Sequence, residues 1–426
     1  MEIFSNFLQE RFKMNEKDFT RNRKQSFSGT VLFMVNFLTK SLSLEIVNFV
    51  SHLKEKLGRG QFTFTKSAFV QARNKISPEV FLYLIKRLND EFYTDNSDVK
   101  LGLNGFRVLA IDGSCITLPT TAELEKLYGK SKNQSQSYTV QARASVLYDL
   151  SNRMALNGIL EHIDLGEREL ALQQLQHCKK GDLVIYDRGY PSYDLMYEHY
   201  QKNIDFLMRA KSGFNSTVRL FLESGKTSQV VELCPGKRMD LTGKAYDKNT
   251  PLKIRFIRIE LPGGEIELLM TSLTDSKKYN HNVFKELYFR RWKIETYFDE
   301  LKNKLGVENF SGYSNQSILQ DFYAAIFVSN LQSLIVAELA EELQENGNDT
   351  KYNYKVNTAL SYGFMKDRIL TVFLDKGDMN IIINELKDLF RGNLVPIRPE
   401  RSNPRNVGKY KARVKPKITK NQKSSL

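Results

Sequence analysis

Two short apolar runs near the middle of the chain each lead directly to an aspartate. Residues 107–111 read Arg-Val-Leu-Ala-Ile and precede Asp112, and residues 183–186 read Leu-Val-Ile-Tyr and precede Asp187. Runs of this length and composition predict buried β-strands. Because functional groups collect where the strands of an α/β sheet end, both carboxylates are candidate site residues. A lone aspartate at such a position is more often a turn or helix cap, so the pair alone does not decide the matter.

The pattern around these strands predicts a mixed sheet. Apolar and polar positions alternate through 142–148 and 153–159 on either side of a polar turn, which is typical of a β-hairpin. We expect a helix at 167–177 and a further strand at 206–210. The order strand, hairpin, helix, strand, helix, strand indicates an α/β sheet with antiparallel and parallel parts.

The regions on either side of this sheet differ from it. Residues 1–95 carry apolar positions at helical spacing, and one capped helix there carries Lys66, Arg73 and Lys75. Two short helices around a turn could dock on DNA or form a small structural bundle, and the pattern does not choose between them. Strand-like alternation returns in 212–274, which we interpret as a separate strand-rich insertion.

The charge of the chain indicates a polyanionic partner. Lys and Arg number 63 against 49 Asp and Glu, so the formal net charge is +14 at pH 7. Nine of these basic residues lie in 401–426, a segment that contains no acid. Such a tail cannot bury a core, and we expect it to be disordered until it meets phosphates. Nucleic acid is the commonest polyanion, although general solubility also accounts for an excess of this size.

Cysteine and histidine usage argues against a disulfide framework and a zinc site. The three cysteines lie far apart without a CxxC pair, and the five histidines are scattered, which favours a reducing compartment. The chain begins without a signal-peptide pattern. Its longest uncharged run, between Asp321 and Glu338, is too short to span a bilayer, and we interpret it as part of a buried helix.

A long helix predicted at 282–305 carries the third candidate carboxylate. At ~100° per residue, four of its side chains fall within ~60° of one another, on one face. These four are Tyr288, Arg291, Glu295 and Lys302. A carboxylate between cations suits a metal site flanked by DNA backbone, whereas an exposed helix with charge pairs is the simpler explanation. Asp299 shares the face, so spacing does not choose between it and Glu295.

The same segment resembles the Y-(2)-R-(3)-E-(6)-K signature of bacterial insertion-sequence DDE transposases. All four positions and all three spacings match in 288–302. The segments 111–114, 186–190 and 308–312 also resemble this class and follow in the same order. The resemblance extends over roughly 65–416 and is specific because several motifs recur together.

The resemblance implies an α/β fold with an RNase H-like mixed sheet core, a β-strand insertion, and helical regions at both termini. In such a core, Asp112, Asp187 and Glu295 would be catalytic and would bind two Mg²⁺ or Mn²⁺ ions, to which carboxylates are suited. The implied reaction is cut-and-paste DNA transposition: water nicks one strand, and the freed 3′-OH then attacks DNA. Residues implied to contact phosphates are Tyr288, Arg291, Lys302, Arg209 and Lys211. The segment Gly166–Leu170 also resembles a stretch of the family, and we assign it no catalytic role.

The resemblance also implies partners and a division of the chain. The partner is double-stranded DNA, namely terminal inverted repeats and target DNA, and the protein would be a homodimer in the synaptic complex. We expect a cytoplasmic, nucleoid-associated protein with no membrane partner. The expected segments are a helical DNA-binding region at 1–95, the catalytic core at 96–211 and 275–345, the β-rich insertion at 212–274, and a helical region with the basic tail at 346–426.

Two alternatives and one departure from the class remain. A two-metal nuclease without strand transfer would use the same carboxylates, and a DNA-binding remnant would have no need to keep all three. Some relatives place a tryptophan in the insertion, where it stacks on a flipped base during hairpin formation. Here Glu267 stands before the similar apolar run, and we expect the only tryptophan, Trp292, to pack in the core. Phe256 could take over the stacking, or the hairpin route could differ.

Overall fold

The computed structural model describes most of the chain, and the structural statements below concern these residues. They are 5–21, 25–36, 38–57, 63–95, 101–132, 138–261, 264–345, 353–366, 368–374 and 379–397. The basic tail predicted at 401–426 and the polar break at 346–349 lie outside them. The chain forms two compact units. One comprises Met1–Leu88, Ile116–Ala142 and Asp299–Leu426, and the other comprises Asn89–Cys115 and Arg143–Phe298.

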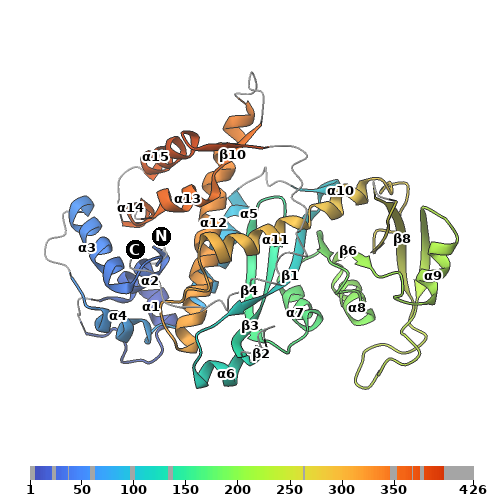
Figure 1. The fold of residues 1–426 in the computed structure, drawn as a ribbon, viewed down its shortest axis with the longest axis horizontal. Helices are drawn as coiled ribbons and strands as arrows, with labels where there is room; N and C mark the ends of the chain where they lie inside the picture. The colour runs from blue at the N-terminus through green and yellow to red at the C-terminus, as the bar shows by residue number, and fades with distance from the viewer. Residues whose placement is uncertain are drawn as a thin grey trace, which may run out of the picture. The chain divides into compact units, whose positions relative to one another are not determined.

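The second unit is built on a mixed β-sheet. Its first five strands are β1 (Arg107–Thr117), β3 (Tyr138–Asp149), β4 (Met154–His162), β5 (Asp182–Tyr186) and β6 (Asp205–Ala210). They lie in the order β4-β3-β1-β5-β6, and β5 is parallel to both of its neighbours. Backbone bonds from Leu118 to Val140 and from Leu150 to Val108 make β3 antiparallel to β1. This arrangement confirms the predicted α/β class with its mixed sheet core (Figure 1).

The predicted insertion continues this sheet and is not separate from it. It contains α9 (Ser216–Glu223), β7 (Ser228–Leu233), β8 (Leu252–Glu260) and β9 (Ile266–Thr271). Strand β9 pairs antiparallel with β6, and β8 and β7 follow it. The expectation of a separate element was wrong because the edge of β6 offers unpaired backbone groups, which β9 satisfies.

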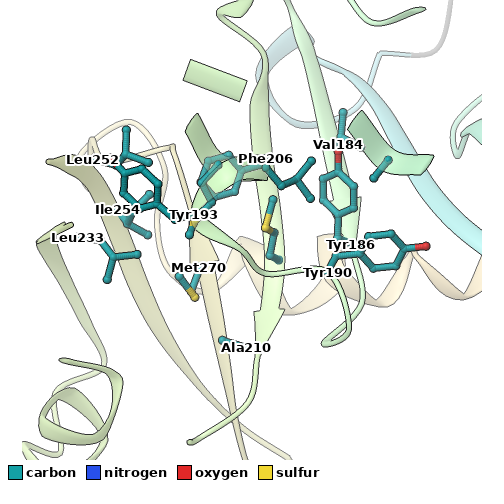
Figure 2. Close-up of a cluster of buried hydrophobic side chains, with 14 of the residues drawn as sticks. Val184, Tyr186, Tyr190, Tyr193, Phe206, Ala210, Leu233, Leu252, Ile254 and Met270 are labelled. Carbon is teal, nitrogen blue, oxygen red and sulfur yellow. The ribbon is translucent and has the colours of Figure 1, made fainter. Parts of the chain in front are cut away.

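A shared hydrophobic core joins the insertion to the central strands. Figure 2 shows Val184 and Tyr186 of β5 and Phe206 of β6 in one cluster with Leu252 and Ile254 of β8. Helix α7 (Glu167–Gln174) continues as a 3₁₀ turn at Leu175–His177, and helix α8 is Tyr193–Lys202. A fully buried Tyr186 hydroxyl within this cluster lies 2.8 Å from His199 Nε2 of α8, so the polar atoms of the core are also paired.

Strand β1 does not end at Asp112 as predicted. It continues to Thr117, because the long strand β3 pairs along it beyond the point where β5 stops. Its last residue paired with β5 is Ala110. Asp112 therefore lies where β1 loses its parallel neighbour, and its side chain still reaches the carboxyl edge of the parallel strands.

The predicted helix at 282–305 is also interrupted. It consists of α10 (Val283–Phe289), α11 (Trp292–Asp299) and a π-helical segment at Glu300–Lys304. At the break, Arg291 N–H donates to the Tyr288 carbonyl at 3.0 Å, which is the tighter 3₁₀ pattern. The assumption of 100° per residue therefore fails across the break and again in the π-helical segment. Of the four signature residues, Tyr288, Arg291 and Glu295 still lie together, because Arg291 contacts both of the others.

The first unit is mainly helical, as expected for the N- and C-terminal regions. Its helices are α1 (Asn6–Phe12), α2 (Phe27–Val35), α3 (Leu42–Leu57), α4 (Lys66–Arg73), α5 (Glu79–Asp95, which continues into the second unit), α6 (Ala122–Tyr128), α12 (Asn315–Glu345), α13 (Thr358–Met365), α14 (Arg368–Leu374) and α15 (Met379–Arg391). Strand β2 (Lys130–Lys132) pairs with the start of β3, and β10 (Tyr354–Val356) pairs with β11 (Leu394–Pro396).

Helix α12 is the central element of this unit. Among the described residues, Asn315–Leu343 is the one stretch long and apolar enough to cross a membrane, yet 67% of its most apolar window is buried within the protein. Ile318, Phe322 and Ile326 are fully buried, and Asn330 is buried beside them. The interpretation of the uncharged run as part of a buried helix is confirmed.

Arg73 is bound inside this unit and is not exposed for DNA. Its side chain is 1% exposed and donates to Gln320 Oε1 at 2.9 Å and to Asp321 Oδ1 at 2.9 Å. Lys75, the next cation in the candidate DNA-binding helices, is paired with Asp18 at 3.3 Å. Of the three cations considered there, Lys66 remains exposed. This part of the N-terminal region is therefore closer to a structural bundle than to a DNA-reading pair of helices.

Candidate active site

The register of the parallel strands brings the two aspartates level. Ala110 of β1 pairs with Ile185 of β5. Asp112 and Asp187 each lie two residues beyond this last pair, so both come at the same level of the sheet, where the parallel pairing ends. Neighbouring strands lie roughly 5 Å apart, which is within reach of a shared ligand.

Arg291 connects Asp112 to the third predicted carboxylate. Its Nη2 donates to Glu295 Oε1 at 2.8 Å, and its Nη1 lies 3.8 Å from Asp112 Oδ2. The guanidinium is 5% exposed, whereas the Glu295 side chain is 36% exposed. The break between α10 and α11 places Arg291 at the turn, from which it reaches both carboxylates. Glu295 is thus joined to Asp112 through Arg291, and its choice over Asp299 as the third ligand stays a prediction.

Tyr288 connects the same segment to the second aspartate. Its hydroxyl donates to Asp187 Oδ1 at 3.2 Å, and its ring lies 5.7 Å from the Arg291 guanidinium carbon. The side chain is buried, and burial raises the pKa of the Tyr288 phenol, so it remains a neutral donor. Tyr288 and Arg291 therefore position the three carboxylates here, and their predicted contact with phosphates stays a prediction.

Burial and like charge act together on Asp112. The pKa of this carboxyl is raised to about 6, mainly by burial, and the negative charges of Glu167 and Glu295 also act to raise it. The Gly113 amide, which donates to Oδ1 at 2.9 Å, and the Arg291 guanidinium both lower the pKa. The balance leaves an acid cluster that binding a cation would stabilise.

Glu167 is a residue that sequence reasoning left without a role. It is the first residue of α7, and its side chain lies against Gly113 and Gly189, the glycines that follow the two aspartates. Its segment was noted for its resemblance to the family, but the signal in the sequence was only an acid at a helix start. The approach of Glu167 to both strands becomes visible in the folded chain alone.

The donor set fits a divalent cation by its chemistry. Carboxylate oxygens are the hard ligands that Mg²⁺ and Mn²⁺ prefer. Within the described residues, no three His, Cys, Asp or Glu side chains are grouped closely enough to hold a metal ion. Arg291 instead supplies the positive charge among these acids, contacting both Asp112 and Glu295. Asp112, Asp187 and Glu295 are therefore suitable ligands that would have to draw closer to share an ion.

The remaining predicted residues are placed as follows. Arg209 pairs with Glu267 at 2.8 Å, and Lys211, just after β6, is exposed. Lys302 lies in the π-helical segment and belongs to the other compact unit. The expectation that Trp292 packs in the core was wrong, since it is 46% exposed at the start of α11. Phe256 is buried within the sheet and is not available for stacking on a base.

We expect Asp112→Asn to stabilise the protein in the absence of added metal. The Asp112 pKa is raised to about 6 from 3.8, so the native state holds a proton that the unfolded chain releases, and stability falls as pH rises through this window. The variant should gain up to about 3 kcal/mol in the free energy of unfolding at pH 8, and the gain should shrink to about 1 kcal/mol near pH 4.5, because it is lost fully only below the unfolded pKa. Urea unfolding in EDTA at both pH values measures it. A variant less stable than the wild type at pH 8 would contradict this electrostatic account.

Comparison with known proteins identifies the family of the chain. The model of the family described as "Transposase DDE domain" matches residues 104–331, more than half of the chain. The transposase InsG for insertion sequence element IS4 of Escherichia coli (strain K12) is 22% identical over 353 residues, covering 80% of this chain and 76% of its own. A piggyBac transposase in a synaptic complex with hairpin DNA, solved by cryo-electron microscopy, aligns at 8% identity with a TM-score of 0.40, over 91% of this chain and 82% of its own. Because the family model matches more than half of its residues, the chain belongs to the family of the transposase DDE domain.

Proposed function

We propose that the chain catalyses metal-dependent cut-and-paste transposition of DNA. The observation that carries this proposal is the linkage of Asp112, Asp187 and Glu295 through Arg291 and Tyr288 at the carboxyl edge of parallel strands. Two bound divalent cations would supply Lewis acidity at the scissile phosphate and favour the ionised form of an attacking water or 3′-OH. Asp112, Asp187 and Glu295 would hold these ions.

Residues of the chain would do the rest by positioning and charge. Asp112 is held by the Gly113 amide, and Asp187 is oriented by the Tyr288 hydroxyl. Arg291 donates from a buried position, which fixes its planar guanidinium relative to Glu295. With cations bound to these acids, Arg291 would be able to turn one donor to a phosphate oxygen, for which its fork geometry is suited. In this way Arg291 would make the phosphate contact predicted from the sequence.

Double-stranded DNA is the proposed partner, in the form of terminal repeats and target DNA. The formal charge of +14 favours such a polyanion, and Lys and Arg contacts to phosphate make the affinity fall steeply with salt. We further propose that a homodimer pairs two DNA ends and that the protein acts in the bacterial cytoplasm at the nucleoid. The five segments expected from the sequence stay a proposal about how DNA binding and catalysis are divided along the chain.

We expect Lys211→Ala to weaken DNA binding by the same factor for every DNA sequence. Lys211 follows β6, and β6 is parallel to β5, so this exposed cation lies at the same edge of the sheet as Asp187. Loss of one phosphate contact should reduce the slope of log affinity against log salt by about 1. The matched control is Lys180→Ala, because Lys180 is exposed just before the opposite end of β5. Fluorescence anisotropy at several salt concentrations measures both. If the two variants had the same slope of log affinity against log salt, Lys211 would not be a DNA contact.

Two alternatives use the same carboxylates differently. A two-metal nuclease would cut DNA but not join the freed 3′ end to a target. A DNA-binding remnant would bind the ends and cut nothing. The intact set of Asp112, Asp187 and Glu295, held by specific contacts, argues against the remnant.

The experiment that tests the proposal uses a labelled duplex carrying the terminal repeats of the element, with Mg²⁺. The wild-type protein should nick at the repeat boundary, and Asp112→Ala should bind the same duplex and leave it intact. Binding without cutting by the wild type, in Mg²⁺ and in Mn²⁺, would favour the remnant. Equal cutting by Asp112→Ala would place the active site elsewhere.

A further inference from the structure

We propose that Glu167 is a fourth carboxylate of the active site, placed to bind a divalent cation together with Asp112. This inference rests on the proposed function, because it concerns the same metal-dependent site. Glu167 is not one of the three carboxylates predicted from the sequence. The evidence for its role is its position beside the two glycines that follow the aspartates.

The position of Glu167 is not explained by helix capping. Glu169, two residues later, already accepts a hydrogen bond from the Gly166 amide at 2.9 Å and completes the capping box of α7. The Glu167 carboxylate is directed instead toward the ends of two strands. A Cβ atom at Gly113 would lie 3.5 Å from its Oε1, and one at Gly189 would lie 3.5 Å from its Oε2.

These two glycines identify the site that Glu167 faces. Gly113 directly follows Asp112 on β1, and Gly189 follows Asp187 by two residues after β5. One carboxylate thus approaches both of the segments that present the predicted ligands, with a different oxygen nearest to each. The absence of side chains at both glycines leaves the room that this approach needs.

The charge pattern places Glu167 in the same cluster as the two aspartates. The buried phenol of Tyr190 is subject to the negative charges of Asp112, Glu167 and Asp187 together. Asp112 in turn is subject to the charges of Glu167 and Glu295. Four carboxylates therefore act on one small region. Arg291 contacts two of them, and Arg143 contacts Glu167.

Glu167 keeps acceptor capacity for such an ion. Within the described residues, its side-chain partner is Arg143, whose Nη1 lies 3.4 Å from Oε1. Arg143 is itself anchored elsewhere, since its Nε and Nη2 donate to the Ile163 carbonyl at 3.1 and 2.9 Å. A carboxylate has about four acceptor positions, so one long contact leaves most of them available. The side chain is also 40% exposed, which gives a hydrated ion access to it.

A purely structural role makes a different prediction. An acid in the first turn of a helix interacts favourably with the helix dipole and stabilises the helix slightly. Glu167→Gln would then lower stability slightly and leave metal affinity unchanged. Glu169→Gln is the matched control, because it removes the same charge from the same turn and glutamine still supports a capping box.

The experiment is a Mn²⁺ titration of the full chain, with free Mn²⁺ followed by electron paramagnetic resonance. The proteins are the wild type, Asp112→Asn, Glu167→Gln and Glu169→Gln, each checked for folding by circular dichroism. We expect Glu167→Gln to weaken Mn²⁺ binding at least about 10-fold, as loss of a ligand or its partner typically does. Glu169→Gln should stay within about 2-fold of the wild type, since it does not approach the site.

Each outcome separates this inference from the proposed function. If Asp112→Asn loses Mn²⁺ while Glu167→Gln matches Glu169→Gln, the inference is wrong and the metal site stands. If both glutamate variants weaken binding equally, the effect is general charge and the inference is again wrong. If the wild type itself binds no Mn²⁺ at millimolar concentration, the metal-dependent function and the role of Glu167 are both contradicted.

Discussion

Glu295→Gln should lose DNA cleavage by at least about 10³-fold while binding DNA as the wild type does. Glutamine keeps an acceptor oxygen for Arg291, which donates to Glu295 at 2.8 Å, so the local fold should survive. It lacks the negative charge that a hard divalent cation needs. Metal-ion stabilisation of phosphoryl transfer amounts to several kcal/mol, and each 1.36 kcal/mol is about a factor of ten in rate.

The matched control for this prediction is Glu286→Gln. Glu286 lies on α10, pairs with Arg290 at 3.1 Å, and has a side chain that is 80% exposed. Its loss should change cleavage by less than about 2-fold, because exposed pairs of this kind contribute little. Nicking rates and DNA affinities of both variants, measured on one labelled duplex, check the prediction. Cleavage by Glu295→Gln at the rate of Glu286→Gln would exclude Glu295 from catalysis.

Arg73→Ala should destabilise the helical unit by about 3–5 kcal/mol, because removing one partner of a buried ion pair leaves the other uncompensated. Arg73 donates to Ser311 Oγ at 2.7 Å and to the Ser317 carbonyl at 3.2 Å, as well as to Gln320 and Asp321. These bonds tie the end of α4 to the start of α12 and to the loop before it. The substitution removes the Arg73 donor from these acceptors and the cation from Asp321, whose carboxylate keeps, among the described residues, only its bonds from Ser311.

Hydrogen exchange of peptides from α4 and α12 measures this loss directly. A cost of about 3 kcal/mol corresponds to roughly a 10²-fold loss of protection. Lys66→Ala is the control, because Lys66 is exposed on the same helix and exposed positions cost under about 0.5 kcal/mol. A result in which Arg73→Ala keeps its protection but loses DNA affinity would show that Arg73 contacts DNA and is not a structural anchor.

The parts of the fold that could be predicted are those fixed by local pattern. The apolar runs before Asp112 and Asp187 predict buried strands because each strand is covered on both faces. The hairpin, α7 and β6 were likewise predicted, since alternation and turn residues lie within each segment. The level placement of the two aspartates needed the parallel register, which no local pattern contains.

The features that could not be predicted depend on distant parts of the chain. The break at Arg290–Arg291 lies among ordinary helix-forming residues, and the guanidinium of Arg291 finds its partner Asp112 across the sheet. Arginine is usually exposed at the protein surface, so the sequence gives no sign that Arg73 is buried. Its hydrogen-bond acceptors are residues about 240 positions away in the chain. Glu167 reads as a helix-start acid until the fold brings it to Gly113 and Gly189.

A transposase differs from a nuclease in that it joins DNA as well as cutting it. The measurement uses a pre-nicked terminal repeat with a free 3′-OH, a supercoiled target plasmid and Mg²⁺. We predict a product in which the labelled 3′ end is covalently joined to the target, and no product when that end is a 2′,3′-dideoxynucleotide or when Asp112→Ala replaces the wild type. Hydrolysis of DNA without any joined product would contradict the transposase account and identify a two-metal nuclease.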